Sequence, residues 1–568
     1  MLRSIPDALL ISLLLIPAAL MAQQPQPADL IVTANRIYTV DEGRPVAEAI
    51  AVRGGRVVFV GSERGAMALK GASTTVVNYP RANIYPGFID AHAHLLELGA
   101  SLREVDLVGT TSYGEVVQRV VERAKQVPAG AWIIGRGWDQ NDWGDTRFPT
   151  HDALSRAVPN NPVVLSRVDG HALLANAKAM ALAHVTAATK DPAGGRIVRL
   201  PDGSPSGVFV DNAQDLIDRV VPPPTHEETK QAIIAGAQAA NRWGLIGVDE
   251  PGLPRAAIET YEEVARAGQL SLRTYIMIGD NKADLDYYFA KGPQSALYEG
   301  HIWIRSIKMY MDGALGSRGA ALLDPYSDDP GNSGLFVTPP DHIRAVAIEA
   351  LKHGFQVCVH AIGDRGNRTV LDQFEAALKE VPVADHRFRI EHAQILNYAD
   401  IPRFADLDVI PSMQATHATS DMYWAGKRLG SGRLYGAYAW RSLLNTGVII
   451  PNGTDTPVEP INTLRTFHSA ISRQDEQNYP VGGWYPEQRM TREEALKSMT
   501  IWPAEAAFQE QIMGSLTPGK YADFVVLDRD IMTVAPEDIM GTQVVATYLG
   551  GKPVYERPQN APSVSNSR

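Results

Sequence analysis

Short apolar runs typical of buried strands recur along most of the chain, and stretches long enough for helices separate them. Eight such runs follow residue 83, at 84–90, 244–249, 270–278, 302–308, 355–360, 387–391, 408–413 and 447–451. Strands that alternate with helices in this way form parallel sheets. We therefore predict an α/β fold with a (β/α)8 TIM-like barrel over residues 84–510, whose active site lies where the carboxyl ends of the strands meet.

Both ends of the chain carry shorter strands that alternate with turns. Residues 28–83 hold four such runs, and Gly54-Gly55 supplies a tight turn between the last two. Residues 511–556 show the same pattern, with Gly550-Gly551 before the last run. Neither end has enough strands to bury its own faces. We therefore predict one small β-sandwich that is built from both ends of the chain.

The stretch from residue 95 to residue 224 is too long for a single crossover between barrel strands. It contains apolar runs of its own at 132–137 and 163–167, together with helical stretches and Gly-rich turns. We predict an inserted α/β subdomain after the first barrel strand. Because this insert leaves the carboxyl end of that strand, we expect it to cover the mouth of the barrel.

Residues suited to metal binding follow several of the predicted barrel strands. His92 and His94 are separated by one residue, so that on a strand both imidazoles face the same side and can hold one ion. Further candidates follow the fourth, fifth, sixth and eighth runs, namely Lys308, His360, His392 and Asp455. A lone histidine after a strand is more often structural than a ligand. Agreement at five strand ends, however, indicates a metal site.

The motifs around these residues resemble those of the amidohydrolase superfamily of metal-dependent hydrolases, and more narrowly its family 3. They are PGFIDAHAH at 86–94, KMYMDGALGSR at 308–318, HAIGD at 360–364, RIEH at 389–392 and NGTD at 452–455. The resemblance covers nearly all of the chain after the first thirty residues or so. It implies two divalent metal ions. His92, His94 and Asp455 would hold one ion and His360 and His392 the other, while Lys308 would bridge them as a carbamate formed with carbon dioxide.

The chemistry of these side chains agrees with that assignment. Neutral imidazoles and carboxylates suit zinc and related divalent ions. A lysine ammonium has no lone pair to donate, so Lys308 could bind metal only after carbamylation, and the alternative is an ion pair inside the barrel. Water between two such ions can ionise near neutral pH and attack a carbonyl carbon. Asp455 is then the candidate catalytic residue, which takes the proton of the water and passes it to the leaving nitrogen.

Four further residues are candidates for substrate binding. Trp138 and His171 lie in family-like motifs of the insert, His417 follows the seventh predicted strand, and Arg318 follows the lysine strand, where it could meet a substrate carboxylate. Each has a plain structural alternative. Trp138 could pack in a core, and His417 could support the metal ligands rather than touch substrate.

Composition excludes several classes of partner. The net charge is −11 and no block of Lys and Arg is present, which argues against nucleic acid and leaves a small-molecule substrate. The single cysteine, Cys358, lies in an apolar run and cannot form an internal disulfide. The sequence leaves the choice between a monomer and a homo-oligomer open.

The two termini carry no part of the predicted fold. Arg3 precedes an apolar stretch over residues 8–20 that is short for a membrane span, and Ala22 precedes a Gln/Pro-rich segment. We predict a signal peptide over residues 1–22, a secreted or periplasmic location, and no stable membrane insertion after cleavage. An uncleaved membrane anchor is the alternative. Residues 557–568 are rich in Pro, Ser and Asn and are predicted to be disordered.

Together these features predict a metal-dependent amidohydrolase that cleaves a non-peptide C–N bond of an amide, formamide or carbamate. The resembling family includes N-substituted formamide deformylases, although no residue selects that substrate. Alternatives are a deaminase, a cyclic amidase, an esterase or lactonase, and a catalytically silent binding protein on the same scaffold. Lys308 argues against the single-metal deaminases of the superfamily, and the intact ligand set argues against a silent protein.

Overall fold

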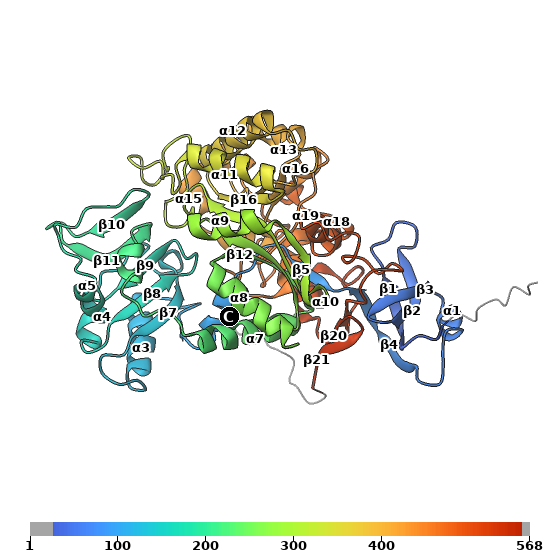
Figure 1. Cartoon of the computed structure of the whole chain (residues 1–568). Helices are drawn as coiled ribbons and strands as arrows, with labels where there is room; N and C mark the ends of the chain where they lie inside the picture. The colour runs from blue at the N-terminus through green and yellow to red at the C-terminus, as the bar shows by residue number, and fades with distance from the viewer. Residues whose placement is uncertain (1–25, 559–568) are drawn as a thin grey trace, which may run out of the picture.

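The computed structural model describes residues 26–558, so that the predicted signal peptide and all of the predicted tail beyond residue 558 lie outside the described residues. Within this range the strands form three sheets (Figure 1). One sheet joins the two ends of the chain, one belongs to the insert, and one is the barrel. None of the described helices combines the length and the apolar character that a membrane span requires.

The barrel sheet is parallel along its whole path, from β5 through β12, β13, β15, β16 and β17 to β18. Its strands are β5 (Phe88–Asp90), β12 (Leu245–Leu253), β13 (Arg273–Gly279), β15 (Ile302–Tyr310), β16 (Gln356–Ala361), β17 (Arg389–His392) and β18 (Ile410–Ser412). The short β14 (Gln294–Ala296) pairs antiparallel with β15. This curled parallel sheet confirms the predicted TIM-like barrel.

Helices connect these strands and cover the outside of the sheet (Figure 1). The principal ones are α7 (His226–Asn241), α8 (Arg255–Arg266), α9 (Lys282–Lys291), α11 (Pro340–His353), α12 (Asp364–Glu380) and α13 (Ile401–Asp406). Local sequence sets their ends. Thr225 and Glu228 form a capping box at the start of α7. Gly354 ends α11 with φ 76°, a conformation that glycine adopts without steric cost.

The eighth predicted strand, 447–451, is not a regular strand in the structure. The chain here instead makes a few isolated backbone bonds to the residues that follow β18 and β5. Met413 N donates to Pro451 O at 3.0 Å, and Ala91 N donates to Asn452 O at 3.2 Å. Pro451 has no N–H to donate, which prevents a regular ladder at this position. The segment that includes Pro451 and Asn452 nevertheless links the first and last strands of the sheet.

The first predicted strand, 84–90, is divided at Gly87. Residues 84–86 end β4 (Thr75–Pro86), which belongs to the terminal sheet, whereas β5 begins the barrel. A Cβ at Gly87 would lie 2.3 Å from Cγ1 of Ile246, so only glycine fits where the chain passes from one sheet to the other. The boundary between the two regions therefore lies a few residues later than predicted.

Strands from both ends of the chain form one seven-stranded sheet, in the order β21-β20-β19-β4-β1-β2-β3. The remaining members are β1 (Leu30–Tyr38), β2 (Val46–Arg53), β3 (Arg56–Gly61), β19 (Phe524–Leu527), β20 (Val544–Leu549) and β21 (Lys552–Glu556). The two ends therefore share a sheet, as predicted. The sheet is a single connected path, and its closure into a two-layered sandwich stays a prediction.

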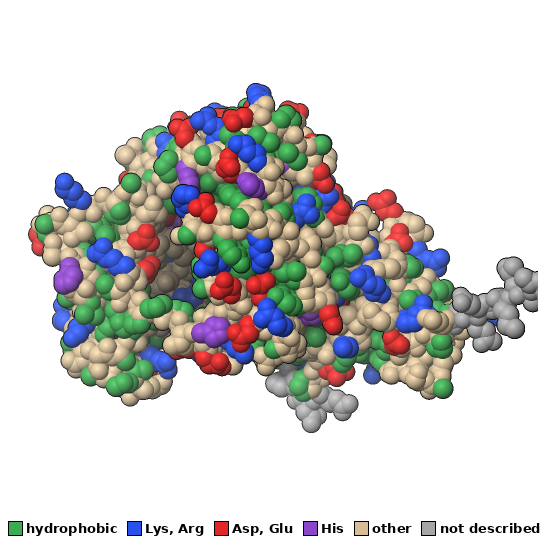
Figure 2. Space-filling model, viewed as in Figure 1, with side chains coloured by type: hydrophobic (Ala, Val, Ile, Leu, Met, Phe, Trp, Pro, Cys, Tyr) green, Lys and Arg blue, Asp and Glu red, His purple; other side chains and the backbone are tan. Residues whose placement is uncertain are grey.

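The insert forms its own six-stranded sheet beside the barrel, at the left of Figure 1. Its strands are β6 (Val105–Asp106), β7 (Ile133–Trp138), β8 (Val163–Arg167), β9 (Ala172–Ala175), β10 (Gly195–Arg199) and β11 (Pro205–Asp211). Helices α3 (Tyr113–Ala124), α4 (Asp152–Ala157) and α5 (Ala177–Leu182) pack around this sheet. Figure 2 shows the surface recessed between the insert and the barrel.

A buried ion pair joins the barrel to the terminal sheet. Arg273 on β13 donates from Nε and Nη2 to the carboxylate of Asp523 at 2.7 and 3.0 Å, and its guanidinium lies 3.6 Å from the ring centre of Tyr521. Both charged side chains are almost fully buried. Removal of one partner from such a pair leaves an uncompensated buried charge.

We expect Arg273→Met to reduce the free energy of unfolding by about 3–5 kcal/mol, the usual cost of breaking a buried pair. The measurement is the shift of the first transition in urea denaturation. Arg147→Met is the matched control, because Arg147 pairs with Asp145 on the exposed surface and its loss should leave the transition unchanged. Equal shifts in the two variants would contradict a special role for the buried pair.

Candidate metal centre

Buried carboxylates fix the backbone that carries His92 and His94. Asp90 Oδ1 accepts from the backbone N–H of His92 and of Thr454 at 3.1 and 2.9 Å, and Asp90 Oδ2 accepts from the Thr454 hydroxyl at 2.6 Å. Burial raises the pKa of Asp90 to about 7. This carboxylate therefore ties the end of β5 to the segment that closes the barrel.

Glu250 on β12 performs a similar task for the helix that follows His94. Its carboxylate accepts from the backbone N–H of Leu95 and Leu96 at 2.6 and 3.2 Å, at the start of α2 (Leu95–Ser101). Such acceptors satisfy the free N–H groups of a helix start. Burial raises the pKa of Glu250 to about 8.

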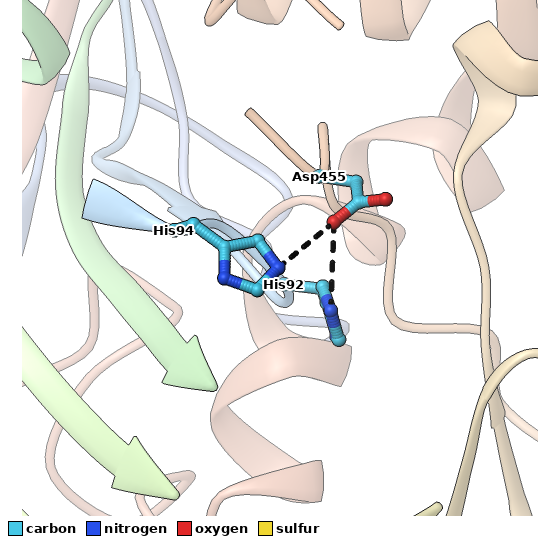
Figure 3. A group of neighbouring side chains, drawn as sticks. All are labelled: His92, His94 and Asp455. Carbon is cyan, nitrogen blue, oxygen red and sulfur yellow. Dashed lines mark ion pairs between the residues drawn. The ribbon is translucent and has the colours of Figure 1, made fainter. Parts of the chain in front are cut away.

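One carboxylate oxygen of Asp455 faces both His92 and His94 (Figure 3). Its Oδ1 is 3.6 Å from His92 Nε2 and 3.4 Å from His94 Nε2. Burial alone would raise the pKa of Asp455, but the bond to His94 and the nearby histidines hold it below its usual value. The carboxylate is thus an anion that faces two imidazole nitrogens, an arrangement able to hold a divalent cation.

A carboxylate behind His92 fixes the orientation of its ring. His92 Nδ1 is 2.6 Å from Glu391 Oε2, and both side chains are fully buried. With Nδ1–H donated to Glu391, the lone pair of Nε2 faces Asp455, which is the tautomer that a metal ligand requires. Burial lowers the pKa of His92 well below its usual value, so the ring is neutral.

Arg389 holds Glu391 in place. Its Nε is 2.7 Å from Glu391 Oε1, and its Nη1 donates to Asp249 Oδ2 at 2.6 Å. The same guanidinium donates to the carbonyl of Ala91 at 2.5 Å, next to His92. One buried arginine therefore connects β17, β12 and the end of β5 beneath the histidines.

Lys308 projects from β15 toward the same group. Its Nζ is 3.2 Å from His92 Nε2, and the side chain is buried. Burial lowers the pKa of Lys308 to about 8. The structure therefore brings Lys308 beside the predicted ligands, as the sequence indicated.

His392 neighbours both His92 and His360. His392 Nδ1 is 2.7 Å from Gln414 Oε1, and the centres of the His392 and His360 rings are 4.6 Å apart. His360 Nε2 is buried without a hydrogen-bond partner among residues 26–558. Its closest carboxylate oxygen is Asp312 Oδ1, at 3.8 Å.

Two groups of side chains could each hold one ion. Their ligand atoms lie within 4.8 Å of one another, and the groups are His92, His94 and Asp455, and His392, His417 and Asp455. His360 and Lys308 border these groups. His417, which we predicted to contact substrate, thus stands among the potential ligands.

A divalent ion fits this arrangement. Buried polar atoms in folded proteins nearly always have a partner. His360 Nε2 and His417 Nε2 have none among the described residues, and both nitrogens are available to a cation. The carboxylate and imidazole donors are those that zinc and similar ions prefer.

The insert brings His171 to the metal centre. The His171 ring centre is 4.9 Å from that of His360, and His171 Nδ1 is 2.7 Å from Asp211 Oδ1. Burial alone would lower the pKa of His171, but Asp211 outweighs it and raises the pKa. His171 therefore lies where a substrate contact is expected, although the sequence analysis missed its partner Asp211.

Two of the predicted substrate contacts lie elsewhere. Trp138 is fully buried in the core of the insert, where its indole N–H donates to the carbonyl of Leu165 at 2.7 Å. Arg318 is paired with Asp328, with Nη2–Oδ2 at 3.0 Å. The indole packs in a core because its N–H finds a backbone acceptor there, and Arg318 shares the carboxylate of Asp328 with the buried Arg428. The structure therefore favours structural roles for both residues.

The residues that position the ligands were also missed in the sequence. They are Arg389, Glu391, Gln414 and Asp249, while Asp211, also missed, positions His171. A signal for two of them exists, because Arg389 and Glu391 alternate along one strand and so face the same side of an otherwise buried run. Charges of opposite sign on the inner face of a strand indicate a buried pair.

Comparisons with known proteins identify the family. The model of the amidohydrolase family matches residues 83–555. The chain is 35% identical to Protein LONG AFTER FAR-RED 3 of Arabidopsis thaliana, over 93% of this chain and 92% of that protein. It is 27% identical to the N-substituted formamide deformylase of Arthrobacter pascens, over 94% and 99% of the two chains.

A solved structure agrees with this result. The fold resembles that of an uncharacterized metal-dependent hydrolase from Pyrococcus horikoshii with a TM-score of 0.72, at 27% identity. The match covers 89% of this chain and 99% of that one. The likeness extends over the barrel and beyond it, so it is not confined to a few motifs.

We expect Glu391→Gln to weaken metal binding about 10- to 100-fold, the range seen when a partner of a ligating histidine is changed. The glutamine keeps the shape and an acceptor but loses the charge that orients the His92 ring. The measurement is competition for zinc with a chromogenic chelator. Glu48→Gln, on the exposed side of β2, is the control. Unchanged zinc affinity in Glu391→Gln would contradict the role assigned to this carboxylate.

Proposed function

The chain belongs to the amidohydrolase family, and from that premise we propose that it hydrolyses a non-peptide C–N bond of an amide, formamide or carbamate with two divalent ions, zinc being the best fit. The observation that carries the proposal is the position of Asp455. Its carboxylate faces the Nε2 atoms of both His92 and His94 at 3.4–3.6 Å and is held as an anion.

Bound divalent ions would polarise the substrate carbonyl and ease the ionisation of water near neutral pH. The residues of the chain do the rest. His92 and His94 present their Nε2 atoms to Asp455 Oδ1, and Glu391 prevents the His92 ring from turning. Asp455 accepts a proton from water at one carboxylate oxygen and delivers it to the leaving nitrogen, as a general base that becomes a general acid.

Lys308 serves this centre as a carbamate in our proposal. Its Nζ lies 3.2 Å from the nitrogen with which His92 would bind metal, so an ammonium there would repel the ion. Reaction with carbon dioxide replaces the positive charge by a carboxylate-like group. The buried position of Lys308 would protect that group from water.

The formamide deformylase of Arthrobacter pascens supports formamides as the first substrates to test. His171 is the best candidate for a contact with the substrate, because the insert holds it against His360 and Asp211 fixes its ring. We also propose that the protein is secreted or periplasmic, on the strength of the apolar N-terminal segment alone.

The function is tested with metal-replete enzyme and a panel of N-substituted formamides, amides, carbamates and esters. We expect Asp455→Asn to lower kcat on the cleaved C–N substrates by about 10²–10⁴, the range that general acid–base groups supply. Asparagine keeps the shape and one oxygen donor but cannot carry the proton. Metal content is measured in parallel.

Asp286→Asn is the control, since Asp286 pairs with Lys282 on the exposed surface, outside the ligand groups. The proposed role of Asp455 fails if the asparagine variant turns over at the wild-type rate. The proposed reaction fails if the wild-type enzyme, with metal bound, cleaves esters but no C–N bond.

We further expect His171→Ala to retain both ions and to change the ranking of substrates, because its ring lies beside the ligands and not among the two ligand groups. The measurement is kcat/KM across the same panel. Trp138→Phe is the contrast, since its indole packs inside the insert and its loss should lower stability without a change in ranking. A uniform loss of activity in His171→Ala would indicate a structural role instead.

A further inference from the structure

Arg136 lies on β7 of the insert, and its side chain reaches the barrel. The register of β7 against β8 shifts directly after Arg136, and Gly137 has φ 100°, so a bulge follows the arginine. Bulges redirect side chains and are frequent next to active sites. A Cβ at Gly137 would also lie 2.5 Å from Cγ2 of Val108, so only glycine fits there. The local backbone is therefore built to hold Arg136 in one direction.

The guanidinium of Arg136 is bonded to the turn that carries Asp455. It donates from Nη1 to the carbonyl of Pro457, just beyond Asp455, and from Nη2 to the carbonyl of Val168 at 3.3 Å. The turn itself is fixed, because the N–H of Val458 donates to the carbonyl of Asp455 at 2.8 Å. Arg136 accordingly interacts electrostatically with Asp455. The insert thus holds a cation close to the carboxylate to which we assign the proton transfer.

Both partners of this guanidinium are neutral carbonyls. Among residues 26–558 Arg136 forms no ion pair, although it is partly buried. By contrast, Arg167 pairs with Asp139, and Arg428 pairs with Asp328. Burial lowers the pKa of Arg136, and the carboxylates around it oppose this effect only in part. The charge is therefore available to an anion, and the planar fork of an arginine matches a carboxylate.

Tyr310 offers a second donor at the mouth of the barrel. It is the last residue of β15, and its ring centre lies 4.8 Å from Lys308 Nζ and 5.5 Å from the ring centre of His360. The side chain is partly exposed, and its hydroxyl makes no hydrogen bond to any of residues 26–558. A phenol keeps its proton at neutral pH and can donate it to a bound molecule.

Arg136 and Tyr310 share their charged neighbours. Glu97 and Asp455 interact electrostatically with both of them. The side chain of Glu97 is 66% exposed, so water and salt screen its repulsion of an anion. The guanidinium and the phenol therefore offer donors to an anionic group close to Asp455.

We propose that Arg136, together with Tyr310, binds a carboxylate that the substrate carries on the carbon next to its scissile nitrogen. This inference names the substrate class of the proposed function, on which it rests, as N-formyl and other N-acyl amino acids. In such a molecule the carboxylate lies on a short arm from the nitrogen that Asp455 protonates, so a guanidinium close to Asp455 can reach it. Arg136 takes the role that the sequence suggested for Arg318, which is paired with Asp328.

The test compares N-formylglycine with N-formylglycinamide, its neutral counterpart, on metal-replete full-length protein. Binding is measured by calorimetry in the Asp455→Asn background, where turnover is slow, and kcat/KM is measured with Asp455 intact. We expect the wild-type residues at 136 and 310 to favour N-formylglycine in both measurements. Arg136→Gln should reduce this preference about 10- to 100-fold, as expected for hydrogen bonds to a charged group. Arg136→Lys keeps the charge but loses the fork, and should reduce it less.

Tyr310→Phe removes one donor without a change of charge, and it should reduce the preference less than Arg136→Gln does. It also provides the readout if the Arg136 variants do not fold. Arg147→Gln is the matched control, because Arg147 belongs to the insert but pairs with Asp145 on the exposed surface. The preference should remain unchanged in this variant.

Two results would overturn the proposal. One is wild-type protein that does not favour N-formylglycine over the neutral amide. The other is an Arg136→Gln variant that loses melting temperature and activity on both probes equally, as expected if Arg136 only joins the insert to the barrel. Failure of the proposed function is a separate result, namely protein that binds N-formylglycine through Arg136 but cleaves no C–N substrate.

Discussion

The segment that closes the barrel also carries the carboxylate at the centre of the site. Asn452 accepts from the N–H of Ala91, and three residues later the N–H of Asp455 donates to the carbonyl of His92 at 2.7 Å. Closure of the sheet and assembly of the ligands are therefore one event. A barrel that failed to close here would leave His92 and His94 without their carboxylate.

Beneath the segment that closes the barrel, the barrel interior contains several buried charged side chains. Arg389, Asp249 and Glu391 are fully buried, and such ions are costly to remove from water. Arg389 pairs with both carboxylates, and the last contact in the series is the bond between Glu391 and His92. This network costs stability, but it holds the His92 ring in one tautomer and one orientation, which a metal ligand requires.

The sequence predicted the parallel barrel, the shared terminal sheet and most of the residues around the metal centre. The spacing of apolar residues and the types of residue at strand ends are local signals, which a sequence displays directly. It missed features that depend on partners distant in the chain. Pro451 turned the eighth strand into isolated bonds, and Gly87 moved the start of the barrel. The sequence suggested Trp138 as a substrate contact, but in the structure its indole N–H has a backbone acceptor in the core of the insert. His417 could not be recognised as a potential ligand before Asp455 was placed beside it.

One of the contacts between the insert and the centre is made by a buried carboxylate, Asp211. Asp211 bonds His171, and the loop after β15 passes so close that a Cβ at Gly313 would lie 2.6 Å from Asp211 Oδ1 and one at Gly319 2.5 Å from Oδ2. Only glycines allow that loop, which follows the strand of Lys308, to close on the carboxylate. A shift of the insert would therefore disturb two contacts at once. One is the contact of His171 with His360, and the other is the contact of Asp211 with the loop that follows the strand of Lys308.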